Sequence, residues 1–181
     1  MSTQFAGLLR SQVRNEFTAS QQYIAIAVWF DGQDLPRLAA RFYAQGVEER
    51  NHALMMVRYI LDREWEVAVP GVDAVRNDFS TPADPIALAL AQERAVTEQC
   101  EALFRAARAD GDVLSEQFML WFLKEQVEEV SSMSTLLTIT ERAGEDWFQI
   151  EEHLAREPDA ESAPDSGTPD TAGGALQPLQ G

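Results

Sequence analysis

Four acidic groups in this sequence have the residue types and the spacing of a buried metal centre. Each lies within a long stretch of helical periodicity. They are Glu16, the pair Glu49 and His52, Glu93, and the pair Gln126 and Glu129. Burying a carboxylate is costly unless a partner compensates its charge. Four such groups at one depth of a helical bundle would need shared cations, which is how a bundle builds a two-iron site.

The predicted turns place these groups at one height. Counted from the nearer turn centre, Gln33 or Gly111, Glu16 lies 17 residues away, Glu49 16, Glu93 18, Gln126 15 and Glu129 18. A helix rises about 1.5 Å per residue, so in antiparallel hairpins these positions are nearly level. The sequence therefore predicts one polar layer at mid-bundle.

Residue type and helical face support a metal role over two alternatives. A spacing of three residues puts Glu49 and His52 on one face, and the same holds for Gln126 and Glu129. Carboxylates with imidazole suit divalent iron. Any one glutamate could instead belong to a solvated helix face. An ion-pair network with Arg50 or Arg94 is the other alternative, but a helical step of about 100° turns both arginines off the face.

The elements that would position this layer are four long helices. Helical periodicity covers about residues 4–30, 34–62, 84–109 and 113–143, with a short fifth helix at about 145–156. Asp34 and Asp84 have the sequence context of N-caps, and Gly144 that of a helix stop. The long connection 63–83 must cross the whole fold. The prediction is an all-α four-helix bundle with a long crossover between helices two and three, plus the fifth helix.

The chain divides into a folded domain, 1–156, and a C-terminal tail, 157–181. The tail holds four of the eight prolines and neither Lys nor Arg. We expect this acidic, Pro- and Gly-containing segment to be disordered.

Composition narrows the class of partner. A net charge of −16 without a basic patch argues against nucleic acid. No apolar run approaches a membrane span, no signal peptide is apparent, and Cys100 is the single cysteine. We expect a cytoplasmic protein.

The chain resembles a ferritin of the non-haem bacterial type found in actinobacteria. The resemblance covers about residues 4–156 and is carried by 15–17 with 22–23, 47–52, 92–94 and 125–129. It implies that Glu16, Glu49 and His52 bind a first iron, with Glu49 bridging to a second held by Glu93 and Glu129. Gln126 would lie beside the second iron near the oxygen-binding position. Tyr23 matches the tyrosine next to the centre.

The resemblance also implies features outside the diiron centre. Glu48, Glu125 and Glu128 match a third iron site of bacterial ferritins, and Glu116 matches an acidic residue of the three-fold channels. A surface-charge role is the alternative for each of them. The implied assembly is a hollow shell of 24 subunits with the fifth helix on the four-fold axes. The tail, ending in the apolar stretch 174–179, could load the protein into a larger shell.

Two departures from bacterioferritins concern haem. Bacterioferritins carry a haem-ligating methionine after the bridging glutamate, and Arg50 occupies that position here. Their second Glu-x-x-His pair is replaced by Gln126 and Glu129. No haem is therefore expected.

The implied function is iron storage and detoxification, with Fe(II) oxidised by dioxygen at the diiron centre and stored as a ferric mineral. Three alternatives remain: a non-catalytic storage or scaffold subunit, another ferritin-like diiron oxidase or peroxidase such as a rubrerythrin, and a DNA-protecting mini-ferritin. A rubrerythrin usually adds a Cys-x-x-Cys module, which one cysteine cannot form. A mini-ferritin places its metal between subunits.

Overall fold

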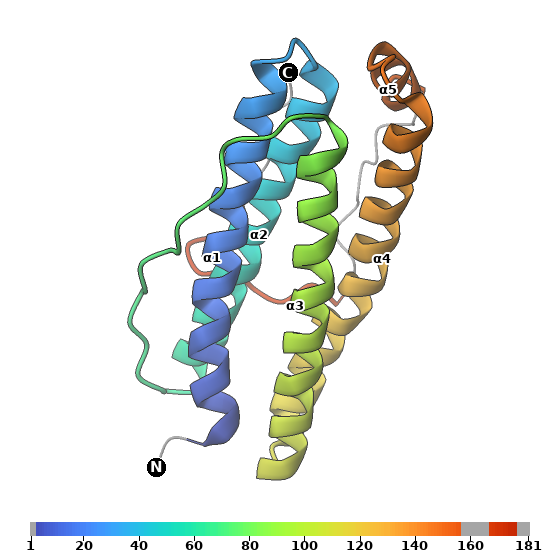
Figure 1. Ribbon diagram of the computed structural model, residues 1–181. Helices are drawn as coiled ribbons and strands as arrows, with labels where there is room; N and C mark the ends of the chain where they lie inside the picture. The colour runs from blue at the N-terminus through green and yellow to red at the C-terminus, as the bar shows by residue number, and fades with distance from the viewer. Residues whose placement is uncertain (1–2, 157–166, 177–181) are drawn as a thin grey trace.

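The computed structural model describes residues 3–156 and 167–176 (Figure 1). Its helices are α1 (Gln4–Asp31), α2 (Pro36–Asp62), α3 (Ala83–Asp110), α4 (Val113–Ala143) and α5 (Phe148–Leu154). No strand occurs among these residues, and none of their helices is long and apolar enough to cross a membrane. Helices α1 and α2 form one antiparallel hairpin, and α3 and α4 form the other. The predicted all-α bundle with a crossover is confirmed.

Local chemistry explains where several helices begin and end. The Thr3 hydroxyl accepts a hydrogen bond from the Ala6 amide at 3.2 Å and caps α1. The Asp112 carboxylate caps α4 in the same way through the Ser115 amide, also at 3.2 Å. Gly111 and Gly144 follow α3 and α4 with φ of 70° and 58°, a left-handed conformation that glycine adopts without strain.

Both predicted aspartate N-caps are wrong. Asp34 adopts a left-handed backbone conformation, φ 56°, and Leu35 takes the N-cap position before Pro36. Asp84 lies inside the first turn of α3, where its Oδ2 accepts hydrogen bonds from the amides of Ser80 at 2.8 Å and Thr81 at 3.1 Å. It therefore fixes the turn before the helix. The fifth helix, at Phe148–Leu154, is shorter than predicted.

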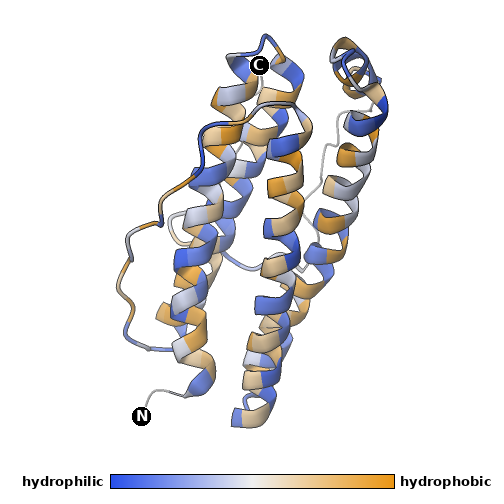
Figure 2. Ribbon diagram, in the orientation of Figure 1, coloured by the Kyte–Doolittle hydropathy of each residue, from blue (hydrophilic) through white to orange (hydrophobic). Residues whose placement is uncertain are grey.

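Two separate apolar clusters fill the bundle, one toward each end. The first cluster includes Tyr23, Phe30, Leu38, Phe42, Ile86, Leu90, Met133 and Leu136. The second includes Phe5, Leu9, Met56, Ile60, Cys100, Leu103, Met119 and Phe122. On each long helix, the predicted diiron residues fall between the two clusters in sequence. They are Glu16, Glu49, His52, Glu93, Gln126 and Glu129. Figure 2 shows hydrophobic and hydrophilic residues along every long helix, as amphipathic packing requires.

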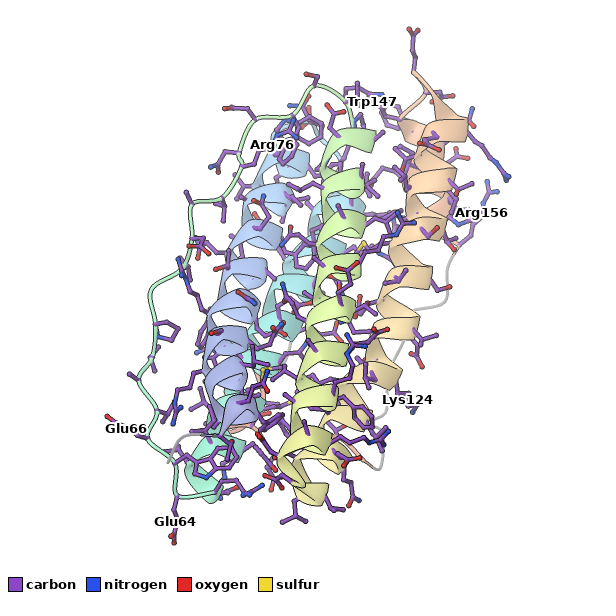
Figure 3. All side chains as sticks on the ribbon, turned by 60° about the horizontal axis from the view of Figure 1, so that its bottom comes forward. Glu64, Glu66, Arg76, Lys124, Trp147 and Arg156 are labelled. Carbon is purple, nitrogen blue, oxygen red and sulfur yellow. The ribbon has the colours of Figure 1, made fainter. Side chains whose placement is uncertain are left out.

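The crossover, residues 63–82, runs along the outer side of α1 and is bound there by polar side chains at four-residue intervals (Figure 3). Arg10 Nε donates to the Glu66 carbonyl at 2.7 Å, and the Thr18 hydroxyl accepts from the Asp73 amide at 3.1 Å. Arg14 pairs with Asp73. The Gln22 amide exchanges two hydrogen bonds with the backbone of Arg76, at 2.7 and 2.8 Å, as a neighbouring strand would. These bonds carry the chain to the start of α3.

Residues 167–176, part of the tail that we expect from its composition to be disordered, lie against α2. The Asn51 side chain exchanges two 3.0 Å hydrogen bonds with the backbone of Leu176, and the Ala172 amide donates to the Leu54 carbonyl at 3.2 Å. An asparagine that satisfies the backbone in this way leaves no periodic pattern in sequence. Residues 157–166 and 177–181 lie outside the described part of the chain, so the predicted loading of the tail into a larger shell stays a prediction.

The aromatic stack in the first cluster predicts a large loss of stability when it is removed. Phe42 is fully buried, stacks on Phe30 with ring centroids 5.4 Å apart, and lies 5.8 Å from the Tyr23 ring. Phe42→Ala is expected to lower the free energy of unfolding by about 3–5 kcal/mol through lost burial and a residual cavity. Guanidinium unfolding followed by circular dichroism measures this. The exposed Val28→Ala should change stability far less, and equal losses would contradict the assignment.

Candidate metal centre

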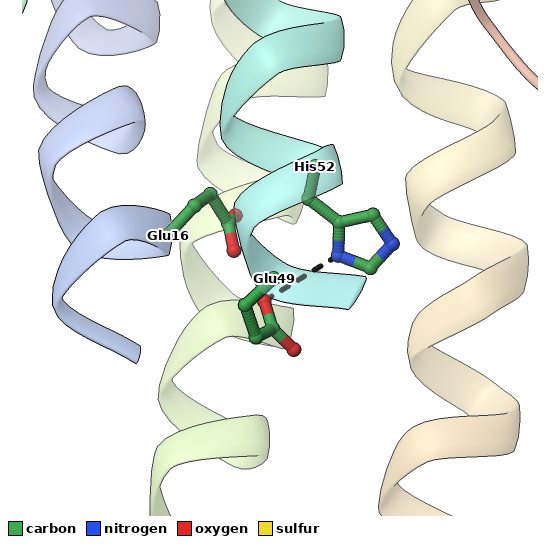
Figure 4. A group of neighbouring side chains, drawn as sticks. All are labelled: Glu16, Glu49 and His52. Carbon is green, nitrogen blue, oxygen red and sulfur yellow. Dashed lines mark hydrogen bonds and ion pairs between the residues drawn. The ribbon is translucent and has the colours of Figure 1, made fainter. Parts of the chain in front are cut away.

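Glu16 of α1 and the pair Glu49 and His52 of α2 form one compact group (Figure 4). One ligand atom from each lies within 4.8 Å of the others, and all three residues are buried. His52 Nδ1 lies 3.4 Å from Glu49 Oε2. A spacing of three residues places Glu49 and His52 on one face of α2, and the α1–α2 hairpin brings Glu16 to their height.

Glu93 of α3 and Glu129 of α4 complete the buried layer. Counting residues from the turns predicts this common height. Glu93 is 1% exposed and Glu129 6%. Both Glu93 oxygens already accept hydrogen bonds, Oε1 from the Tyr23 hydroxyl and Oε2 from Gln126 Nε2 at 3.4 Å. Glu93 therefore belongs to the same layer but lies outside the group of Glu16, Glu49 and His52.

The amide of Gln126 presents its nitrogen to this layer. Its Oε1 accepts a hydrogen bond from the Thr97 hydroxyl at 3.0 Å, and its Nε2 faces Glu93. In this orientation Gln126 is a hydrogen-bond donor to the site, and a role as an oxygen ligand would require the amide to turn over. Thr97 also approaches the Glu93 carbonyl at 2.8 Å, which holds its hydroxyl against α3.

Burial and mutual repulsion favour the protonated carboxyls of this layer. Burial raises the pKa of Glu16 well above its ordinary value, and the nearby Glu49 raises it further. Burial, with Glu93 second, does the same to the pKa of Glu49. Burial and the charge of Glu48 raise the pKa of Glu129 to about 8. Burial is likewise the largest cause of the raised pKa of Glu93. A divalent cation would reverse this preference by compensating the charge.

Two buried carboxylate oxygens have no hydrogen-bond partner. Glu16 Oε2 and Glu49 Oε1 are both removed from solvent. An unpaired buried acceptor is costly, and such groups are uncommon in folded proteins. Two of them in one group of carboxylate and imidazole ligands fit a divalent metal of the iron type.

A second group of carboxylates adjoins the first. One oxygen each from Glu48, Glu125 and Glu129 lies within 4.8 Å of the others, so Glu129 belongs both to the buried layer and to this group. Gln45 Nε2 donates to Glu48 Oε2 at 2.8 Å and approaches Glu129 Oε1 at 3.5 Å. Glu128, predicted for a third iron site, is exposed and lies outside the group. Its sequence neighbour Glu129 belongs to this group, and the third iron site stays a prediction.

The remaining predicted residues occupy distinct positions. Tyr23 is fully buried, and burial and the charge of Glu93 raise the pKa of its hydroxyl well above the ordinary value. Glu116, which we predict to line a channel, forms an ion pair with Arg108 at 3.0 Å. The arginine compensates the negative charge of Glu116. Arg50, at the haem-ligand position, is exposed.

Three polar residues form hydrogen bonds to the predicted site residues but are not predicted from the sequence. They are Gln12, Gln45 and Thr97, which hydrogen-bond to Glu16, Glu48 and Gln126 respectively. The available signal is spacing. Gln12 precedes Glu16 by four residues and Gln45 precedes Glu49 by four, so each shares a helical face with a predicted ligand.

Comparisons with known proteins agree with the resemblance predicted from the sequence. The sequence pattern of the family described as "Ferritin-like domain" matches residues 6–143. The chain is 60% identical to the ferritin BfrB of Mycolicibacterium smegmatis, over 97% of both chains, and 55% identical to that of Mycobacterium tuberculosis, over 96% of both. It is 33% identical to a bacterial non-heme ferritin of Staphylococcus epidermidis, over 81% of this chain and 88% of that protein. An open pore ferritin from Archaeoglobus fulgidus has the same fold, with a TM-score of 0.82 at 23% identity, over 87% of this chain and 98% of the other.

The raised carboxyl pKa values predict a pH dependence for the metal-free protein. The pKa of Glu129 is about 8 in the folded state against an ordinary 4.5, so folding favours its protonated form. Its contribution to stability is complete below pH 4.5 and is lost as the pH rises through 8. The melting temperature of the metal-free protein should therefore fall between pH 5 and 8. Glu129→Gln should flatten this slope, and the exposed Glu128→Gln should keep it. Equal slopes in both variants would contradict the assignment.

Proposed function

This chain belongs to the ferritin family, and we propose that it stores iron by oxidising Fe(II) with dioxygen in the buried carboxylate layer and retaining the product as a ferric mineral. The observation that carries the proposal is the group of Glu16, Glu49 and His52, in which two buried carboxylate oxygens have no partner. Iron is the substrate and the cargo of this protein, so the site must bind it and also release it.

The first Fe(II) is held by Glu16, Glu49 and His52. Glu49 is the bridging ligand, because its second oxygen is unpaired and its strongest electrostatic neighbour is Glu93. Glu93 and Glu129 hold the second Fe(II). For Glu93 this requires at least one of its oxygens to exchange a hydrogen bond from Tyr23 or Gln126 for the metal.

Each of the two Fe(II) ions gives up one electron, and one dioxygen molecule accepts both. Hard carboxylate oxygens stabilise Fe(III) over Fe(II), which favours this transfer. The Gln126 amide supports the step as a donor aimed at the second iron position, where reduced oxygen gains negative charge. Tyr23 donates to the other oxygen of Glu93 and positions that carboxylate.

Oxidised iron leaves through the second group of carboxylates. Glu129 belongs both to the buried layer and to this second group, so it can pass an ion from the diiron centre to Glu48 and Glu125 without releasing it to water. Burial and the charge of Glu48 raise the pKa of Glu125, and a cation at this group would lower it again. Glu128 is exposed and follows this group in sequence next to Glu129, and we assign it a later step toward the mineral.

The subunit assembles with further copies into a hollow shell of 24 in the cytoplasm. Several large apolar side chains remain exposed on the single subunit, as expected for residues that partner subunits cover. They include Val69, Val113, Val127 and Phe148, each more than two-thirds exposed. Helix α5, which carries Phe148, lies at the four-fold axes. Glu116 lines the three-fold channels together with its ion-pair partner Arg108.

Removal of the bridging ligand tests the oxidation site. Glu49→Ala should leave a folded shell of about half a megadalton by gel filtration, because it removes a carboxyl that is costly to bury and keeps both apolar clusters. Aerobic Fe(II) addition followed by ferric absorbance should then show oxidation near the buffer blank. The wild type should oxidise rapidly, with a fast first phase that ends near two irons per subunit. If the wild-type shell assembles but does not oxidise Fe(II), the proposed oxidation is wrong and the protein is a non-catalytic storage subunit.

Neutralising the second group tests the exit path. Glu48→Gln with Glu125→Gln should leave the first two irons to be oxidised at an initial rate close to wild type, since neither residue belongs to the first group. Turnover beyond two irons per subunit should slow, because product is not drawn away. Repeated Fe(II) additions measure this, with the exposed Glu141→Gln as a control. Unchanged multiple turnover would remove these residues from the path.

A further inference from the structure

Gln12 is a buried polar residue that the proposed reaction leaves without a role. It lies on α1 one turn before Glu16 and is 2% exposed. Its Nε2 donates a hydrogen bond to Glu16 Oε1 at 2.9 Å. A polar side chain in an apolar helix interface is costly to bury unless its partners are well placed. The partners of Gln12 therefore indicate what the residue does.

The bond from Gln12 makes the two oxygens of Glu16 different. Oε1 is engaged by Gln12, whereas Oε2 is buried without a hydrogen-bond partner. A glutamate carboxylate can turn about its last carbon–carbon bond, a broad and shallow torsion. One fixed donor removes that freedom and leaves Oε2 as the oxygen open to a cation.

Gln12 is itself oriented by the next residues outward. Asn15 Nδ2 donates to Gln12 Oε1 at 3.1 Å and approaches Gln99 Oε1 of α3 at the same distance. Because the Gln12 oxygen accepts from Asn15, its NH2 group must face Glu16. The three amides thus form a series between α1 and α3 that ends at the carboxylate, and both helices hold it in place.

We propose that Gln12 is a positioning residue that fixes Glu16 as a ligand through Oε2 alone for the first divalent cation. This inference rests on the proposed metal centre and adds a residue to it. The bond also favours the charged carboxylate, the form that binds metal. Without it, Glu16 is free to rotate, to bind through both oxygens or to turn toward Glu49.

The test uses Co(II) as a redox-stable probe under anaerobic conditions, with the intact assembled protein. Gln12→Leu and Gln12→Met keep a similar volume but donate no hydrogen bond. For either variant, the dissociation constant of the first Co(II) should rise roughly tenfold, as expected for loss of a hydrogen bond to a charged group. The visible Co(II) spectrum should also change, because it reports ligand number and geometry. Fe(II) oxidation should show a raised KM with kcat within about twofold of wild type.

Controls separate positioning from packing and from failure of the metal centre. Gln21→Leu makes the same change at an exposed position of α1 and should bind Co(II) as wild type does. If both Gln12 variants keep the wild-type melting temperature, Co(II) affinity and spectrum, Gln12 only fills space and the inference is overturned. If the variants melt earlier but retain the Co(II) spectrum and affinity, the role is structural and the inference also fails. If wild-type protein binds no Co(II) that Glu16→Gln abolishes, the proposed metal centre itself fails.

Discussion

Carboxylates that are removed from water repel one another and lose their hydration, and the bundle is built around this cost. Glu16, Glu49, Glu93 and Glu129 meet in one layer with an apolar cluster on either side. Burial is the largest cause of the raised pKa at each of them. The apolar clusters supply the burial energy that keeps the four helices together despite this layer. The layer in turn separates what would otherwise be one continuous core.

The position of this layer could be predicted because it depends on regular geometry. A constant helical rise and two short turns determine which residues of a hairpin are level, so Glu16 met Glu49 at the expected height. Helical periodicity then selects the face, and it turned Arg50 outward to solvent. The height and the helical face of these residues therefore followed from counting along the sequence. Their chemical roles are proposals.

The orientation of individual polar groups could not be predicted in the same way. Whether Gln126 presents oxygen or nitrogen depends on Thr97, which lies 29 residues away on another helix. Asp34 has the sequence context of an N-cap. In the tight α1–α2 turn, however, this position adopts a left-handed backbone conformation, so Asp34 forms part of the turn instead. Residue Leu176 is bound through one asparagine, Asn51, whose side chain satisfies backbone groups far along the chain. Such contacts carry no period that a sequence reveals.

The binding of the crossover to α1 bears on the order in which the chain folds. Arg10, Arg14, Thr18 and Gln22, its anchors, all belong to the first hairpin, so residues 4–82 can form their contacts before the second hairpin arrives. The second hairpin closes from local contacts, which are quick to form. If both hairpins form first, their docking is the step that brings Glu93 and Glu129 to Glu16 and Glu49. A cation present at that step would act on the folding rate as well as on the finished protein.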